Sequence, residues 1–123
     1  MLVANSYIEA GAANADTERL VALAMQGHCL VRRRIADRKI VSEDLLVVLA
    51  GDRNAEVRAA VAANPNTPLS VVRNLAFDAN PDVRYSMAEN HKLPRLILEQ
   101  LMMDENPYVQ CRAKSTYRRV FGS

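Results

Sequence analysis

The chain has 123 residues, a formal net charge of +2, and 50% hydrophobic residues, with few aromatics and no tryptophan. This length suits one domain with a modest core, and the many alanines, valines and leucines favour closely packed short helices over a sheet. The small positive charge is far below that of a dedicated duplex-binding protein, so charge alone assigns no partner.

The N-terminal segment, residues 1–15, shows no targeting pattern. It has no early positive charge and only short apolar runs, unlike a secretory signal or membrane anchor. The two cysteines, Cys29 and Cys111, form no Cys-x-x-Cys pair, so neither a disulfide framework nor a metal site is indicated. We therefore expect a cytoplasmic protein, and we assign residues 1–15 to an N-terminal cap.

The first predicted helix covers residues 16–25, with Asp16 or Thr17 as its N-cap. Its apolar stripe follows the helical period and consists of Leu20, Leu23 and Ala24. The same stripe recurs 26 positions later at Leu46, Leu49 and Ala50. We interpret this helix as the second helix of a partial repeat, and residues 1–25 as the cap plus that partial repeat.

Residues 26–51 form the first full repeat. Its departures from the later repeats lie at the helix ends, because Ser42 replaces a corner proline and His28 and Arg38 replace asparagines. The capping signals are therefore less clear here than in the repeats that follow.

Residues 52–77 are the clearest repeat. Asn54 is a good N-cap and Glu56 complements the helix dipole in the first turn. The helix presents an apolar face and ends near Ala63, because residue Asn64 precedes a proline. That face consists of Val57, Ala60 and Val61.

A second helix follows the corner in this repeat. Thr67 and Pro68 provide a cap followed by a proline, which is a typical helix start. The expected apolar stripe consists of Leu69, Val72, Leu75 and Ala76. Each repeat is therefore predicted to be a helix, a corner and a second helix.

The last two segments, 78–103 and 104–123, repeat the opening phrase of the clearest repeat. Asp52, Asp78 and Asp104 each begin a seven-residue phrase that recurs every 26 positions. A fixed period of this size indicates stacked supersecondary units that bury their apolar faces against one another. We predict an all-α single domain with full repeats at 26–51, 52–77 and 78–103, closed by a half repeat at 104–123.

Residues 54–76 read Asn-Ala-Glu-Val-Arg-Ala-Ala-Val-Ala-Ala-Asn-Pro-Asn-Thr-Pro-Leu-Ser-Val-Val-Arg-Asn-Leu-Ala, which resembles the leucine-rich repeat variant family. The resemblance covers roughly residues 26–120. It implies a right-handed α-solenoid, related in layout to HEAT and armadillo arrays, in which one helix of each repeat can be a tight 3₁₀ turn. Some proteins with this repeat also carry a cysteine-rich iron–sulfur segment before the repeats. These residues contain no such segment, so we expect no cofactor.

Arginine recurs at one position of successive repeats, at Arg32, Arg58 and Arg84, which we call the arginine ladder. Gln110 stands at the fourth position. Such a row can grip carboxylates or phosphates along a groove. Alternatively, each arginine bonds an acid or the terminal carbonyls of a neighbouring repeat, and periodic polar residues usually serve the repeat interfaces in this way. The candidate acids are Asp52, Asp78 and Asp104.

A second basic feature is a cluster formed by Arg32, Arg33, Arg34, Arg38 and Lys39. Only Arg34 and Arg38 share a helix face. Together with a basic stretch at the other end of the chain, this cluster could attract nucleic acid or an acidic protein. That stretch contains Arg112, Lys114, Arg118 and Arg119. A solvated face is the alternative, and the aromatics that stack single-stranded bases are missing from the cluster.

Catalytic and metal-binding patterns are missing from the sequence. His28 and His91 have no partner at ligand spacing, and no nucleophile–base set or phosphate-binding glycine loop is found. We therefore expect a protein that is not an enzyme and binds no metal.

Scarce aromatic residues gather in the final half repeat, at Tyr108, Tyr117 and Phe121. Terminal repeats normally need a polar outer face, so these rings either fold back over the preceding helices or form a homodimer interface.

From these patterns we predict a non-catalytic module that binds a protein segment along its repeat surface, with no membrane contact. The alternative function is nucleic-acid binding through the basic residues. The candidate contacts with a protein partner are Arg32, Arg58, Arg84, Tyr85 and Arg95.

Overall fold

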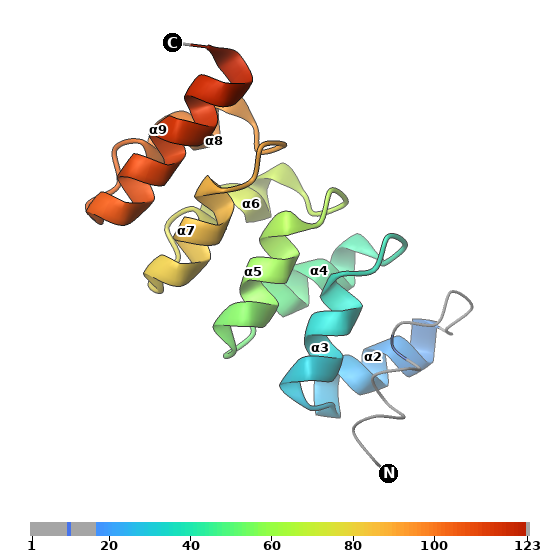
Figure 1. The fold of residues 1–123 in the computed structure, drawn as a ribbon. Coiled ribbons are helices and arrows are strands. Elements are labelled where there is room, and N and C mark those ends of the chain that lie inside the picture. Colours follow the sequence, from blue (N-terminus) through green and yellow to red (C-terminus); the bar gives the residue numbers. More distant parts are fainter. Residues whose placement is uncertain (1–9, 11–16, 123) are drawn as a thin grey trace. The chain divides into compact units, whose positions relative to one another are not determined.

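The computed structural model describes residue 10 and residues 17–122, and within these it contains eight α-helices and no strand (Figure 1). The all-α prediction is confirmed, and every described helix is an α-helix rather than a 3₁₀ turn. Of the predicted N-terminal cap, residues 1–15, only Ala10 is among the described residues. The candidate N-cap Asp16 also lies outside the described residues. The helices are α2 (Thr17–Gln26), α3 (Cys29–Ala36), α4 (Glu43–Ala50), α5 (Ala55–Ala63), α6 (Leu69–Leu75), α7 (Pro81–Ala88), α8 (Arg95–Leu101) and α9 (Pro107–Phe121).

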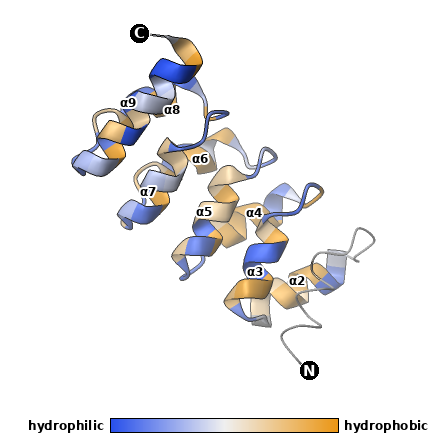
Figure 2. Ribbon diagram, viewed as in Figure 1, coloured by the Kyte–Doolittle hydropathy of each residue, from blue (hydrophilic) through white to orange (hydrophobic). Residues whose placement is uncertain are grey.

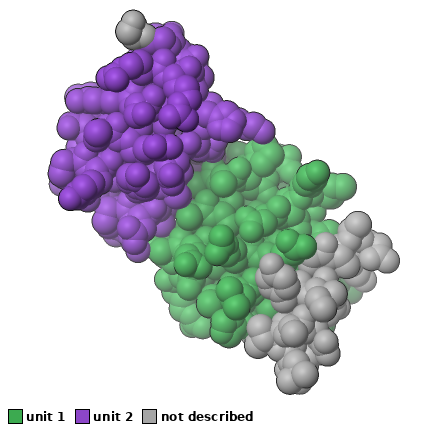
Figure 3. Space-filling view, in the orientation of Figure 1, with its two compact units in different colours: residues 1–68 green, residues 69–123 purple. Residues whose placement is uncertain are grey.

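The chain divides into two compact units, Met1–Pro68 and Leu69–Ser123 (Figure 3). In the first unit α3 packs against α2, α4 and α5, and α4 also contacts α5. In the second unit α9 packs against α7 and α8, which contact each other. Each unit therefore places helices from corresponding parts of the sequence repeat side by side, α3 with α5 and α7 with α9.

Helix starts follow the sequence period closely. The first helices of the repeats begin at residues 29, 55, 81 and 107, and the second helices at residues 17, 43, 69 and 95. Both series advance by 26 residues. The recurring phrase in the sequence thus marks recurring helix boundaries.

Asparagine caps fix the first helices as predicted. The side-chain oxygens of Asn54, Asn80 and Asn106 each accept a hydrogen bond from an N–H group in the first turn, at 2.8–2.9 Å. The repeat with unclear signals is capped as well, by other side chains. His28 accepts from the N–H of Leu30 and Ser42 from that of Leu45, both at 3.2 Å. A ring nitrogen and a hydroxyl therefore replace the asparagine and the proline of the clearer repeats.

The predicted roles of Thr67 and Leu69 were wrong. Helix α6 begins at Leu69, so Thr67 stands too far upstream to cap it, and its hydroxyl donates instead to the carbonyl of Val61 at 2.6 Å. Leu69 is 51% exposed rather than part of the buried stripe. Its place at the first residue of a short helix leaves its side chain outside the core.

The core follows the other predicted apolar stripe residues except Ala50, which is only half-buried. Val57, Ala60 and Val61 are buried on α5. In Figure 2 helix α4 is mainly hydrophobic, whereas the loops between helices are mainly hydrophilic. Stripe residues that are also buried are Leu20, Leu23, Ala24, Leu46, Leu49, Val72, Leu75 and Ala76.

Polar side chains at one repeat position bind backbone carbonyls of the preceding repeat. The amide of Asn64 donates to the carbonyl of Ala36 at 2.8 Å, and the hydroxyl of Thr116 donates to that of Ala88 at 2.5 Å. Arg38 makes the corresponding bond to Ala10 at 2.7 Å. Each donor lies 28 residues after its acceptor. These bonds satisfy carbonyl groups at helix ends, which lack partners within the helix.

Candidate functional site

Arg32, the first residue of the arginine ladder, is held in an ion pair inside the first unit. Its Nε donates to Oδ2 of Asp52 at 2.6 Å and its Nη2 to Oδ1 at 3.1 Å, while Nη1 donates to the carbonyl of Gly27 at 2.6 Å. The side chains of Arg32 and Asp52 are only 9% and 8% exposed. This guanidinium group therefore links two successive repeats.

Arg84 makes the equivalent pair inside the second unit. Its Nε and Nη2 donate to Asp104 at 2.8 and 3.3 Å, and its Nη1 donates to the carbonyl of Asp78 at 2.6 Å. Arg58 is half-buried and donates in the same way to the carbonyl of Asp52 at 2.7 Å. The ladder thus joins helices and turns within the protein.

The Arg32–Asp52 pair is charged at neutral pH. Burial tends to raise the pKa of the Asp52 carboxyl, but hydrogen bonds from Arg32 and from the N–H of Asn54, with the positive charge of Arg32, outweigh burial and lower it. The hydrogen bond from Asp52 in turn raises the pKa of Arg32. The ion pair therefore stabilises the charged forms of both the Arg32 guanidinium and the Asp52 carboxylate.

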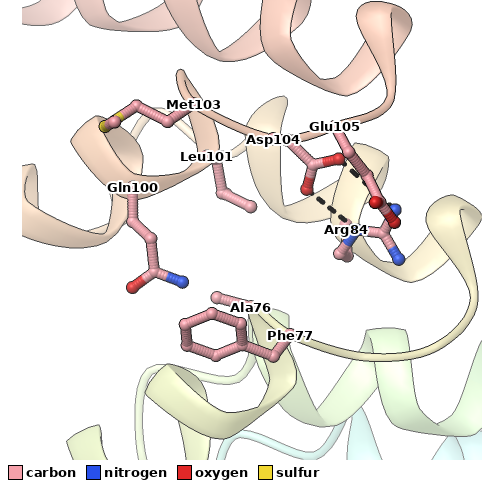
Figure 4. A pocket seen from close by; sticks show the side chains of 8 residues that line it. All are labelled: Ala76, Phe77, Arg84, Gln100, Leu101, Met103, Asp104 and Glu105. Atoms are coloured by element: carbon pink, nitrogen blue, oxygen red, sulfur yellow. Dashed lines mark hydrogen bonds and ion pairs between the residues drawn. The ribbon is translucent and has the colours of Figure 1, made fainter.

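A pocket of about 430 Å³ lies in the second unit, between the turn after α6 and the turn after α8 (Figure 4). Two large apolar side chains, Phe77 and Met103, line it and are 73% and 83% exposed. We call it the Phe77 pocket. Its lining residues are Ala76, Phe77, Arg84, Gln100, Leu101, Met103, Asp104 and Glu105.

Some of the polar groups that line the Phe77 pocket are already hydrogen-bonded, and others are not. Asp104 is occupied by Arg84 and by the N–H of Asn106, which donates to it at 2.8 Å. Glu105 makes no ion pair and the side chain of Gln100 makes no hydrogen bond within residues 17–122. The pocket therefore combines apolar walls with one neutralised ion pair, one uncompensated carboxylate and one available amide.

The remaining candidate contacts lie in different places. Tyr85 is exposed on α7. Arg95, at the start of α8, donates to the hydroxyl of Tyr117 at 2.8 Å, and its guanidinium carbon lies 5.5 Å from the ring centres of both Tyr117 and Phe121. Neither Tyr85 nor Arg95 lines the Phe77 pocket.

The predicted self-association residues do not form one patch. The rings of Tyr117 and Phe121 lie 5.1 Å apart and contact each other and Arg95 within the second unit. Tyr108 is 76% exposed near the opposite end of α9, about 14 Å from Tyr117 and about 20 Å from Phe121 along the helix axis. Tyr117 and Phe121 therefore contact α8 through Arg95, and the homodimer interface stays a prediction.

The predicted basic cluster is spread over α3 and the following turn. Arg33 pairs with Glu56 at 3.2 Å, and Arg38 donates to the carbonyl of Ile40 at 3.1 Å. Arg34 and Lys39 are exposed. Arg32 is buried in its pair with Asp52, so the cluster does not present all of its charges on one face.

The pocket residues Phe77, Gln100, Met103 and Glu105 were not predicted from the sequence. A signal was nevertheless present, because Met25, Phe77 and Met103 stand at equivalent positions of their repeats, at or just after the end of a second helix. Gly51 interrupts this series in the repeat between Met25 and Phe77. A large apolar residue is unusual in a turn. Each of these three side chains is more than two-thirds exposed, at 69%, 73% and 83%.

Two negative findings concern the described residues only. Among residues 10 and 17–122, no three His, Cys, Asp or Glu side chains are grouped in a way that would hold a metal ion. No helix in that part of the chain has the length and apolarity needed to cross a membrane.

Comparison with curated proteins finds no match, and comparison with solved structures finds none either. One family of helical repeats does match, over a shorter stretch than the resemblance seen in the sequence. The family model described as leucine rich repeat variant matches residues 55–80, so this part of the chain is similar to a repeat of that family.

Proposed function

We propose that the chain is a non-catalytic cytoplasmic module that binds a segment of a partner protein on its repeat surface. In this proposal the repeats form a right-handed α-solenoid of 26-residue units. Helix starts that advance by 26 residues support that architecture. Stacked repeats offer extended surfaces, which such proteins commonly use for binding.

The Phe77 pocket is the observation that carries the proposal. Large apolar side chains that stay exposed beside a few convergent polar groups are typical of binding sites. Phe77 and Met103 meet this description, with Gln100 and Glu105 beside them. An aromatic ring and a flexible thioether can bury a partner's apolar side chain with little rearrangement.

Replacing both Phe77 and Met103 with serine should abolish capture of the partner while leaving the fold intact. Both side chains are mostly exposed, so their loss removes little core packing. The measurement is an affinity pull-down from the native host followed by mass spectrometry, with circular dichroism to check folding.

Leu96→Ser is the matched control for this double variant. Leu96 is 74% exposed on α8 but does not line the pocket. It should retain every protein that the unsubstituted chain captures. Equal capture by the double variant and the control would contradict the proposal.

Nucleic-acid binding is the second candidate function. The exposed positive charge of helix α9 favours it. Lys114, Arg118 and Arg119 are exposed on α9, which contains no acidic residue. A complex led by phosphate contacts loses affinity steeply between low and physiological salt. Failure of labelled DNA and RNA to bind at low salt would exclude this candidate.

A further inference from the structure

We propose that the Phe77 pocket selects segments in which an apolar side chain lies next to a lysine or arginine. This inference rests on the proposed function, because it assumes that the pocket binds a protein segment. It adds the chemistry of the partner, argued from the walls, the charge and the hydrogen-bonding groups of the pocket.

The walls require an apolar side chain. Figure 4 shows Phe77 and Met103 on opposite sides of the pocket, with Ala76 and Leu101 between them. Leu101 is 1% and Ala76 3% exposed, so the floor belongs to the core while the two walls face solvent. Burial of an apolar side chain between these walls removes apolar surface of both partners from water.

The charge of the pocket favours a basic neighbour. Arg84 and Asp104 neutralise each other at 2.8 Å, which leaves the carboxylate of Glu105 as the uncompensated charge of the lining. A lysine or arginine of the partner can form a charge-assisted hydrogen bond with that carboxylate. An aspartate or glutamate at the same place would be repelled.

The amide of Gln100 is suited to the backbone of the bound segment. Its NH₂ group can donate two hydrogen bonds and its oxygen can accept them. It makes no hydrogen bond within the described residues. In Figure 4 it extends from α8 toward the Phe77 ring. An extended peptide placed beside the ring can therefore pair its own N–H and C=O groups with this side chain.

The test is selection of a random peptide library, displayed on phage, against the purified full chain. We expect the enriched peptides to combine a large apolar residue with an adjacent lysine or arginine. Their binding, measured by fluorescence anisotropy, should be lost in Phe77→Ser. Glu105→Gln should weaken binding of a selected peptide about threefold and Glu105→Lys about tenfold, the range expected for losing and reversing one exposed charge contact.

Selection on the Glu105→Lys variant should favour acidic residues in place of basic ones. Glu99→Lys is the matched control, because it makes the same charge change on α8 outside the pocket lining, and it should leave the affinity unchanged. Enrichment of apolar peptides without basic residues, together with unchanged affinity in Glu105→Lys, would overturn this inference and leave the proposed function standing. Failure to enrich any peptide whose binding needs Phe77 would overturn both.

Discussion

Replacing Asp52 with alanine should lower the free energy of unfolding by about 3–5 kcal/mol, because removal of one partner leaves a buried charge uncompensated. Asp52 accepts two hydrogen bonds from Arg32 and one from the N–H of Asn54, at 2.9 Å. Its side chain is 8% exposed, so water cannot easily replace these bonds. Urea denaturation of the two proteins measures the difference.

An exposed pair provides the control for Asp52→Ala. Glu56 pairs with Arg33 at 3.2 Å, but their side chains are 69% and 50% exposed, and Glu56→Ala should cost about 1 kcal/mol or less. Replacing both members of the buried pair, Arg32→Met with Asp52→Ala, should recover part of the stability lost in Asp52→Ala, because no lone charge stays buried. Equal costs for Asp52→Ala and Glu56→Ala would contradict a structural role for the ladder.

The same pair predicts a dependence on pH. The pKa of Asp52 is lower in the folded protein than its ordinary value, so the unfolded chain takes up the proton first as the pH falls. The stabilisation is therefore complete above the unfolded pKa of about 3.9. It should decline below that value and be lost once the pH has passed the folded pKa. The difference in unfolding free energy between unsubstituted protein and Asp52→Ala should shrink over this acidic range.

Asn64→Ala should lower the free energy of unfolding by about 2–4 kcal/mol, because it leaves buried carbonyl groups without donors. The Asn64 amide donates to the carbonyls of Ala36 and Arg38, both at 2.8 Å, and its oxygen accepts from the N–H of Asn66 at 2.8 Å. The residue is 6% exposed. Thermal or urea unfolding checks the loss.

Asn66→Ala is the matched control for Asn64→Ala. Asn66 also bonds a carbonyl of the preceding repeat, that of Lys39 at 2.6 Å, but it is exposed and water can take its place. We expect a cost below about 1 kcal/mol. If Asn64→Ala were as stable as Asn66→Ala, the bonds between repeats would not hold the fold as described.

Local chemistry explains why much of the fold could be predicted from the sequence. Asn54, Asn80 and Asn106 act within three residues of their own positions, so a capping rule suffices to place the helix starts. The apolar stripes recur with the repeat, which predicts the buried faces of α4 and α5. The same rules misplaced Leu69 and Thr67, because α6 begins only at Leu69 and the hydroxyl of Thr67 binds the carbonyl of Val61 instead of capping that helix.

The candidate site was harder to predict, because it depends on which side chains are buried in the contacts between repeats and which stay exposed. From the sequence, Arg32 and Arg84 are equally suited to bind a ligand or an internal acid. Their burial with Asp52 and Asp104 is a property of the folded repeats. Phe77 and Met103 in turn are simple apolar residues in a sequence that is 50% hydrophobic. Their equivalent positions after the second helices were a weak signal in the sequence, and their exposure beside a pocket is a property of the folded chain.

Hydrogen exchange of the full chain, with and without a peptide selected on it, is the most direct measurement of binding at the Phe77 pocket. Amides covered by a ligand and stabilised by it exchange more slowly. We predict slower exchange at residues 76–77 and 100–105, with no change at residues 28–40 of the predicted basic cluster. Slower exchange confined to the basic cluster or to α9, at a peptide concentration that saturates binding, would contradict the assignment of this pocket as the binding site.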